Sequence, residues 1–385
     1  MRKTPSYIRV ADQIKLELLS DTKAQSGLKL PTQEELSERF GVSRSTIIRS
    51  LSKLAAEGYL TMQQGSGGYI SHPSKQEALS QSICLIVPVL HASVIVSACR
   101  GVERRARELG YKVMLASSEF GLAHEQELVE QYSAEGTAGI ILYPVTRKKS
   151  ELADDYLLTR SNDIPLVTMD IACEEWPCSR VQFDNFRLCS DMTHRIIRHG
   201  RKNILFMPSF PDLLHSSIDD RQKGWESAAK EAQLPIPESY VKLRASMRTF
   251  SDAENSIDYA SFAQAVQSLS PIPDAVIAWN DITAAYLIQA LINIGVRVPE
   301  DMLVTGFDAE PTISKLFRPQ FPTTKPDFLR LGGMAVDVLH RMKSDATTAQ
   351  RIYYYPVAVQ WRDPRPENVS LVSNRTQADP VETSA

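Results

Sequence analysis

The sequence predicts an α/β protein, in which a small helical domain with a β-wing precedes a larger body built on doubly wound parallel sheets. Three observations carry this prediction. The chain has 385 residues, more than one ordinary domain contains. Apolar residues recur at helical spacing over roughly the first seventy residues. Short apolar runs then alternate with helical stretches over most of the remaining chain.

Composition places the chain among soluble globular proteins, with 43% hydrophobic and 23% charged residues. No apolar run approaches the roughly 20 residues that a membrane span needs, and the first residues lack the apolar core of a signal peptide. We therefore expect a cytoplasmic protein without membrane contact. The five cysteines form no C-x-x-C pair and no metal-ligand spacing. We expect them to be reduced and mostly buried, and we expect no metal or cofactor.

Charge is distributed unevenly along the chain, whose net charge is −3. Through His72 there are ten lysines or arginines against seven acidic residues, a net charge of +3, so the remainder carries −6. A basic head on an acidic body suits a protein of which only one end must approach a polyanion.

The first two predicted helices lie before residue 41. The apolar residues that indicate an amphipathic helix over residues 6–20 are Tyr7, Val10, Ala11, Ile14 and Leu18. A second helix should begin at Thr32, because Glu35 follows it at the spacing of a capping box. Gly41 supplies the left-handed residue that ends this helix, and Ser43 can cap a third helix almost at once. The pattern is that of a helix-turn-helix.

The third helix has a buried face and an outward face. At about 100° per residue, Ile47, Leu51 and Leu54 share one narrow arc, which must pack on the other helices. The neighbouring outward arc holds Arg44, Ser45, Ile48, Arg49 and Ser52. In a DNA-binding helix-turn-helix this helix enters the major groove, where an arginine fork can hold guanine O6 and N7 together. Helix pairs joined by glycine also occur in helical proteins that bind no DNA.

Two short strands around a Gly-rich turn follow Gly58. The segments "YLTM", "QQGSGG" and "YI" predict a β-wing that can lie along the DNA backbone or the minor groove. The same glycines could imitate a phosphate cradle, but no helix is signalled after them. Capped tandem helices, a wing and local positive charge together favour DNA binding.

Residues 30–70, "LPTQEELSERFGVSRSTIIRSLSKLAAEGYLTMQQGSGGYI", resemble the winged helix-turn-helix of the GntR family of bacterial transcription regulators almost from end to end. The resemblance implies contact with double-stranded operator DNA through the third helix and the wing. The DNA-contact residues that we expect are Thr32, Gln33, Ser43, Arg44, Ser45, Thr46, Arg49, Gln64 and Gly65.

The chain departs from the family pattern at three positions. The family usually has arginine at the place of Glu34, often another at the place of Ile48, and commonly threonine at the place of Gly68. Two missing arginines change which bases or phosphates can be contacted. The operator sequence therefore cannot be inferred from relatives.

The domain boundaries follow from changes in composition. We expect the DNA-binding domain over residues 1–71 and a polar linker over 72–82, which contains Pro73 and has no period. A doubly wound body should cover 83–363, where runs such as "ICLIVPV", "AGIILYPV", "NILFMPS" and "MLVTGFD" indicate buried parallel strands. The tail, residues 364–385, has no period, and we expect it to be disordered.

Polar residues stand at the ends of several predicted strands, where doubly wound sheets bind ligands. Asp170 closes "IPLVTMD", and Asp184 and Asn185 follow "RVQF". Asn280 closes "AVIAWN" and Asp308 closes "LVTGF". Each residue alone is more often a helix cap or a turn residue than a ligand contact. Several at equivalent strand ends indicate a binding crevice.

Residues from about 82 to 363 resemble the LacI/GalR effector domain, which is itself like the periplasmic sugar-binding proteins. The segments that carry the resemblance include "GVERRARELGYKVMLASS", "DDRQKGWESAAKEAQL" and "PTTKPDFLRLGGMAVDVL". It implies a two-lobed body, of periplasmic-binding-protein-like fold, with a cleft between the lobes. It also implies that Arg221, Asn280 and Asp308 bind ligand hydroxyl groups there, with Asp170 as a helper.

The residue types suit this chemistry on physical grounds. Arginine and aspartate offer fixed donors and acceptors, which can pair neighbouring hydroxyls of a sugar ring. Trp279 could stack on the apolar face of the ring or belong to the core. The ligand-binding residues that we expect are His91, Asp170, Asp184, Arg221, Trp279, Asn280 and Asp308.

These features predict a ligand-responsive transcription regulator with the arabinose-repressor-like arrangement. We expect a homodimer that represses a carbohydrate-utilisation operon until a small sugar-like effector releases it. A purine-responsive regulator or a solute-binding protein would use the same cleft. The helix-turn-helix and the missing signal sequence count against the solute-binding protein. No enzyme is predicted, since the nucleophile, phosphate-loop and zinc motifs are missing, and "HEQEL" lacks the second histidine of a zinc site.

Overall fold

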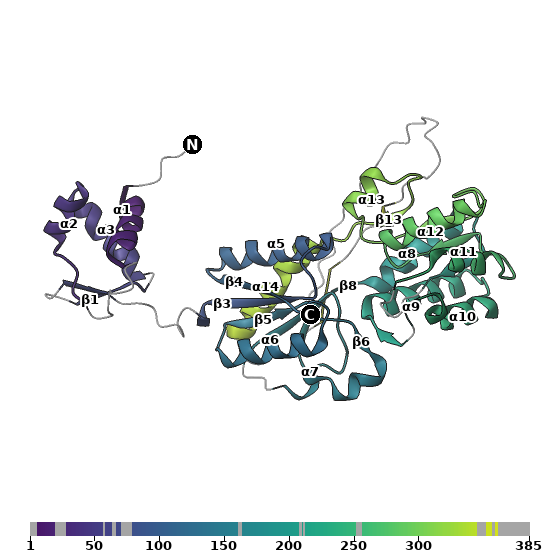
Figure 1. The fold of residues 1–385 in the computed structure, drawn as a ribbon, viewed down its shortest axis with the longest axis horizontal. Helices are drawn as coiled ribbons and strands as arrows, with labels where there is room; N and C mark the ends of the chain where they lie inside the picture. Colours follow the sequence, from purple (N-terminus) through teal and green to yellow (C-terminus); the bar gives the residue numbers. More distant parts are fainter. Residues whose placement is uncertain are drawn as a thin grey trace. The chain divides into compact units, whose positions relative to one another are not determined.

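The computed structural model (Figure 1) describes residues 6–19, 28–56, 58–63, 67–70, 79–160, 164–207, 210, 212–251, 256–344, 352–355 and 359–360. Contacts within the chain divide it into two compact units, residues 1–82 and 83–385. Three predicted features lie outside the described residues: the wing turn with Gln64 and Gly65, most of the linker, and the C-terminal tail.

The first unit packs helices against a two-stranded antiparallel sheet. Its described elements are α1 (Ser6–Ile14), a π-helical turn (Lys15–Leu19), α2 (Gln33–Phe40), α3 (Arg44–Ala56), β1 (Leu60–Gln63) and β2 (Gly67–Ile70). Helix α3 buries Ile47, Leu51 and Leu54 in the common core, as their spacing predicts. The predicted outward arc, which begins at Arg44, is exposed.

The turn between α2 and α3 forms as its residue types require. The Glu35 amide donates a hydrogen bond to the Thr32 hydroxyl, and the Thr32 amide donates one to the Glu35 carboxylate at 2.7 Å. Gly41 ends α2 with a left-handed φ of 60°. The Thr46 amide then donates to the Ser43 hydroxyl at 3.3 Å, which caps α3. The predicted helix-turn-helix is confirmed.

The second unit has two lobes, and the first is built on a six-stranded sheet in the order β14-β8-β7-β5-β3-β4. Its strands are β3 (Ser82–Val87), β4 (Lys112–Ser117), β5 (Gly139–Leu142), β7 (Leu166–Met169), β8 (Ser179–Phe183) and β14 (Ile352–Tyr355). Helices α5 (Ser93–Glu108) and α14 (Phe328–Ser344) cover one face, and α6 (Leu122–Ala134) and α7 (Tyr156–Thr159) cover the other (Figure 1).

Helices α5 and α14 lie so close that glycine is required where they cross. A Cβ on Gly101 would lie 1.9 Å from the carbonyl oxygen of Leu329, and a Cβ on Gly332 would lie 2.1 Å from that of Ala98. Because these positions are glycine, α14, which comes late in the chain, can pack directly against α5, the first helix of the lobe.

The second lobe is built on a three-stranded parallel sheet in the order β12-β11-β9. Its strands are β9 (Ile204–Phe206), β11 (Ala275–Ile277) and β12 (Leu303–Thr305). Helices α8 (Asn185–Arg198) and α9 (Ser216–Glu231) pack on one face. Helices α10 (Glu238–Ala245), α11 (Tyr259–Gln267) and α12 (Asp281–Asn293) pack on the other face. The predicted two-lobed, doubly wound architecture is confirmed.

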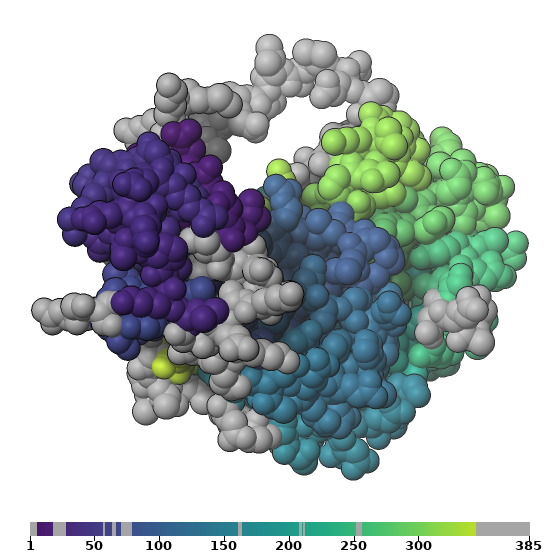
Figure 2. All heavy atoms as spheres, turned by 60° about the vertical axis from the view of Figure 1, so that its left-hand side comes forward, coloured from purple at the N-terminus to yellow at the C-terminus, as the bar shows by residue number. Residues whose placement is uncertain are grey.

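Short segments complete the second unit. They are β6 (Arg147–Lys148), a 3-10 helix (Lys149–Asp154), β10 (Leu213–Leu214), a 3-10 helix (Met247–Phe250), α13 (Pro311–Leu316), β13 (Thr323–Thr324) and β15 (Val359–Gln360). Strand β6 of the first lobe pairs antiparallel with β10 of the second, so backbone hydrogen bonds join the lobes directly. In Figure 2 the blue and teal first lobe and the green second lobe form one continuous body.

The prediction that the cysteines are mostly buried is confirmed. Cys84, Cys173, Cys178 and Cys189 are buried, and Cys99 is half-buried. Burial raises the pKa of the Cys99 thiol to about 11, which keeps it protonated at neutral pH. Among the described residues, no helix is both long enough and apolar enough to span a membrane.

Candidate ligand cavity and DNA-contact surface

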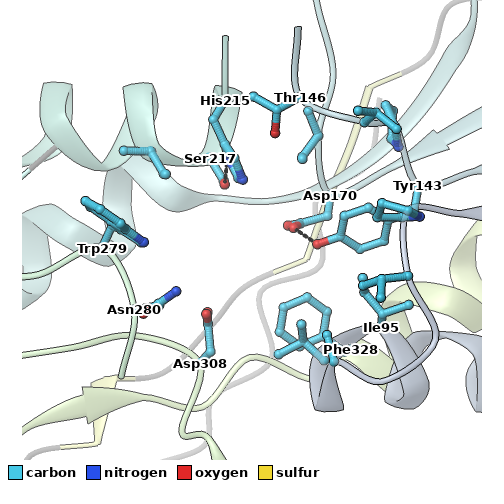
Figure 3. A pocket seen from close by; sticks show the side chains of 18 of the residues that line it. Ile95, Tyr143, Thr146, Asp170, His215, Ser217, Trp279, Asn280, Asp308 and Phe328 are labelled. Carbon is cyan, nitrogen blue, oxygen red and sulfur yellow. Dashed lines mark hydrogen bonds between the residues drawn. The ribbon is translucent and has the colours of Figure 1, made fainter. Parts of the chain in front are cut away.

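A cavity of about 350 Å³ lies between the two lobes of the second unit (Figure 3). Most of its wall comes from the segments after β3, β5 and β7 in the first lobe, and from the start of α9 and the segments after β11 and β12 in the second. Strand carboxyl ends are where doubly wound sheets bind ligands. The polar residues in the wall are Tyr143, Thr146, Asp170, His215, Ser217, Arg221, Asn280 and Asp308.

The structure brings most of the predicted ligand-binding residues together. Those that line the cavity are Asp170, Arg221, Trp279, Asn280 and Asp308. The other two do not line it, which corrects the prediction for them. His91 is exposed in the bend between β3 and α5. Asp184 caps α8, where its carboxylate accepts a hydrogen bond from the Arg187 amide at 3.0 Å.

Arg221 is the central cation of the cavity wall and is only 5% exposed. Its Nε donates to Asn185 Oδ1 at 2.8 Å, and its Nη1 donates to the Trp279 carbonyl oxygen at 2.6 Å. Its Nη2 lies 3.4 Å from Asp308 Oδ1, and the guanidinium stands over the Phe307 ring at 4.2 Å. Asn185, which follows Asp184 at the strand end, is therefore the neighbour that turns inward.

The two aspartates of the cavity wall have an unusual backbone conformation. Asp170 has φ 65° and Asp308 has φ 91°, in the left-handed region that non-glycine residues rarely adopt. Both side chains point into the same space (Figure 3). Burial raises the pKa of both carboxyls, and that of Asp308 reaches about 6 although Arg221 opposes the shift.

Asp170 keeps one oxygen without a protein partner. The Tyr143 hydroxyl donates to its Oδ2, while its buried Oδ1 receives no hydrogen bond from the described residues. A buried acceptor without a donor costs free energy, which a ligand hydroxyl would recover by donating to it. Tyr143 lies within the predicted run "AGIILYPV" and directly follows β5, so the strand-end argument could have found it as well.

His215 and Ser217 also line the cavity, and the sequence carries no motif that singles them out. They stand at the start of α9, where His215 Nδ1 lies 2.8 Å from Ser217 Oγ (Figure 3). Burial, and then the charge of Arg221, lowers the pKa of His215 to about 4, so the imidazole is neutral at pH 7. Asn280 is partly committed as the cap of α12, where its Oδ1 accepts from the Thr283 amide at 2.7 Å.

The raised pKa of Asp308 predicts how stability depends on pH. Its folded pKa of about 6 exceeds the ordinary value near 4, so its stabilising contribution is complete at low pH and is lost as pH rises through about 6. We expect wild type to lose about 2 kcal/mol relative to Asp308→Asn between pH 4.5 and 7.5. Thermal unfolding of both proteins across this range measures the difference. The unfolding free energy of wild type minus that of Asp308→Asn should fall as pH rises. A value that stays constant or rises with pH would contradict the assignment.

A buried ionic network holds one segment of the cavity wall in place. Arg147 is 2% exposed, and it donates to Glu125 at 2.6 Å and to Asp155 at 2.7 Å. The Glu125 carboxylate also accepts from the Val145 amide at 2.6 Å, so the network holds the wall segment that contains Val145 and Thr146.

The candidate DNA-contact surface is the start of α3 beside α2. Arg44 is exposed, its Nε donates to Gln33 Oε1 at 3.1 Å, and its Nη1 lies 3.8 Å from the Glu34 carboxylate. Ser43, Ser45 and Arg49 are also exposed, and Thr46 is half-buried. The structure thus places Glu34 beside an arginine that we expect to contact DNA. At Gly68 a Cβ would lie 3.2 Å from Met62 Sδ, which leaves little room for the threonine of the family pattern.

Two family models match the chain. Residues 6–70 match the model of bacterial regulatory proteins of the gntR family, and residues 193–363 match that of the periplasmic binding protein-like domain.

The chain also resembles curated regulators and a solved structure. It is 27% identical to the arabinose metabolism transcriptional repressor of Geobacillus stearothermophilus, over 88% of this chain and 91% of the relative. It is 26% identical to the HTH-type transcriptional regulator GntR of Escherichia coli K12, over 84% and 96% of the two chains. The structure of a transcriptional regulator CelR-cellobiose complex matches at TM-score 0.61 and 18% identity, over 87% of this chain and 100% of that chain. These curated relatives are regulators of transcription, not enzymes.

Proposed function

We propose that this chain, which joins a GntR-type helix-turn-helix domain to a periplasmic-binding-protein-like domain, represses transcription until a small sugar-like effector occupies the interlobe cavity. The observation that carries the proposal is the polar cavity around Arg221, Asp308 and Asp170, in a chain that also presents a capped recognition helix. The names of its relatives support a role in carbohydrate metabolism, and one structural neighbour was solved with cellobiose.

The DNA side of the proposal rests on helix α3. Its exposed arc can enter the major groove, where Arg44 and Arg49 meet base edges or phosphates. One small domain gives modest specificity, so the repressor acts as a homodimer on two half-sites about 34 Å apart, or a multiple of that spacing. Thr32, Gln33, Ser43, Ser45 and Thr46 lie beside these arginines and complete the contact surface.

The effector acts by changing how the lobes meet. A ligand shifts a conformational equilibrium only by its different affinity for the two states. Thr146 and His215 line the cavity, and they adjoin the β6 and β10 strands that join the lobes. Ligand in the cavity therefore stabilises one lobe arrangement. A coupling of about 1–3 kcal/mol would change operator affinity by about 5- to 150-fold.

The direct test is fluorescence anisotropy with labelled DNA from upstream of the operon that contains the coding gene, with shuffled DNA as the control. We expect salt-dependent binding that is tighter for the upstream DNA, and release by one member of a panel of sugars and nucleobases. A nucleobase that releases the DNA would identify a purine-responsive regulator instead. Equal binding to both DNAs, with and without every panel member, would refute the proposal.

Arg44→Ala should be the most damaging single change on the DNA surface. The arginine stands exposed at the first turn of α3, and loss of a bidentate base contact costs about 1–3 kcal/mol, or about 5- to 150-fold in operator affinity. Anisotropy titrations at fixed salt measure this loss. Operator affinity within twofold of wild type would exclude the proposed docking.

Glu34→Gln is the matched variant in the opposite direction. It removes the carboxylate that lies 3.8 Å from Arg44 and would face DNA phosphates, while it keeps the size of the side chain. We expect affinity for operator and shuffled DNA to rise together by about 3- to 10-fold, because a phosphate-facing charge is not sequence-specific. A loss of affinity would mean that Glu34 orients Arg44 for binding.

A further inference from the structure

We propose that the interlobe cavity selects an uncharged polyhydroxy compound and rejects the carboxylate and phosphate derivatives of the same compound. The inference rests on the proposed function only in treating this cavity as the effector site. It goes beyond that function because sugars, sugar acids and sugar phosphates would all fit a cavity of about 350 Å³.

The charges of the wall favour a neutral ligand. Among the described residues that line the cavity, Arg221 is the only one that is cationic at pH 7, and two carboxylates, Asp170 and Asp308, face it. His215 adds no positive charge, since burial lowers its pKa to about 4. An anionic ligand would therefore enter a space whose net charge is already negative when both carboxyls are ionised.

Arg221, the single cation of the wall, already donates hydrogen bonds to protein acceptors. Arg221 donates to Asn185 at 2.8 Å and to the Trp279 carbonyl at 2.6 Å, and its third nitrogen lies 3.4 Å from Asp308. Tight recognition of a carboxylate or phosphate uses two parallel N–H donors of one guanidinium. Three of the five N–H groups of Arg221, one on each nitrogen, already have a protein acceptor, so an anion could pair only with the two that remain on Nη1 and Nη2.

The hydrogen-bond acceptors in the cavity wall require donors on the ligand. Asp170 Oδ1 is buried without a donor among the described residues, and its Oδ2 is already occupied by the Tyr143 hydroxyl. A sugar hydroxyl can donate to Oδ1 and accept from a neighbouring group at the same time. A carboxylate or phosphate oxygen at that place would carry no proton and would meet the carboxylate directly. The wall is thus matched to hydroxyl donors.

The test compares chemically matched ligands on the full-length chain. D-glucose is compared with D-gluconate and D-glucose 6-phosphate, L-arabinose with L-arabinonate, and D-ribose with D-ribose 5-phosphate. Calorimetry and thermal shift measure binding at pH 7.5. We expect at least one neutral sugar to bind at least about 100-fold more tightly than its anionic derivatives, because like charges disfavour the wrong partner. An anion that binds as tightly as its parent, or a panel in which no neutral sugar binds, would overturn the proposal.

A pair of variants tests the cause of the selection. Asp170→Asn removes one negative charge from the wall and should narrow the ratio of neutral to anionic affinity by about 10-fold or more. Glu174→Gln removes an exposed carboxylate outside the cavity and should leave that ratio unchanged. Equal ratios in wild type and Asp170→Asn would show that the wall charge does not select the ligand.

The two proposals can fail separately. DNA release by an anionic sugar would keep the proposed repressor and overturn the selection of a neutral ligand. Strong binding of a neutral sugar that never changes operator affinity would keep the selection and overturn the proposed regulation.

Discussion

Arg221→Ala should abolish the response to effector while operator affinity without effector stays within about twofold of wild type. The side chain contacts Asn185, Asp308 and the Trp279 carbonyl, so its loss removes the donor that orders the second-lobe wall. It also leaves the Asp308 carboxylate buried without its cation. We expect effector affinity to fall by at least about 100-fold, because a hydrogen bond to a charged group contributes about 1.5–3 kcal/mol and the wall that Arg221 orders is lost with it.

The measurement is an anisotropy titration of the DNA complex with the sugar that binds wild type. Asp308→Ala removes the other half of the pair and should give the same loss of response. Arg187→Ala, an exposed arginine on α8 outside the cavity wall, is the matched control and should respond as wild type does. If both cavity variants release DNA normally, the cavity is not the effector site.

Local sequence patterns were sufficient to predict the cavity residues that stand at the end of a strand. Asp170, Asn280 and Asp308 close apolar runs, and the carboxyl ends of parallel strands meet along one edge of a sheet. The same argument cannot choose between neighbours. At the end of β8 it selected Asp184, which caps α8, whereas Asn185 beside it turns inward to Arg221.

The cavity and network residues that the sequence did not predict are positioned by contacts between segments far apart in the chain. His215 reaches the cavity because β10 pairs with β6 of the other lobe, and a two-residue strand has too few positions to show a period. The ion pairs of Arg147 with Glu125 and Asp155 join three elements of the first lobe, and no spacing rule connects them. On the recognition helix, by contrast, a single helical period was enough to separate buried Ile47 from exposed Arg44.

Arg147→Met should cause the largest loss of stability among these variants. The guanidinium lies between two carboxylates, Glu125 and Asp155, that are almost fully buried. Removal of the cation leaves both charges without compensation, which costs about 3–5 kcal/mol. For a body of this size that corresponds to a fall of roughly 6–15 °C in melting temperature. Calorimetry of the full-length protein measures it.

A triple variant separates the charge from the side-chain packing. Arg147→Met combined with Glu125→Gln and Asp155→Asn removes the cation and both carboxylates. The new amide at position 125 can accept from the Val145 amide through its oxygen and donate to the Tyr156 hydroxyl through its nitrogen, and the amide oxygen at position 155 can still accept from the Leu157 amide. A neutral replacement of a buried ionic group is often close to neutral in stability, so we expect at least half of the lost melting temperature to return. If the triple variant melts no higher than Arg147→Met, the loss comes from the contacts of the guanidinium with Trp176 and the Val145 carbonyl, not from unpaired charge.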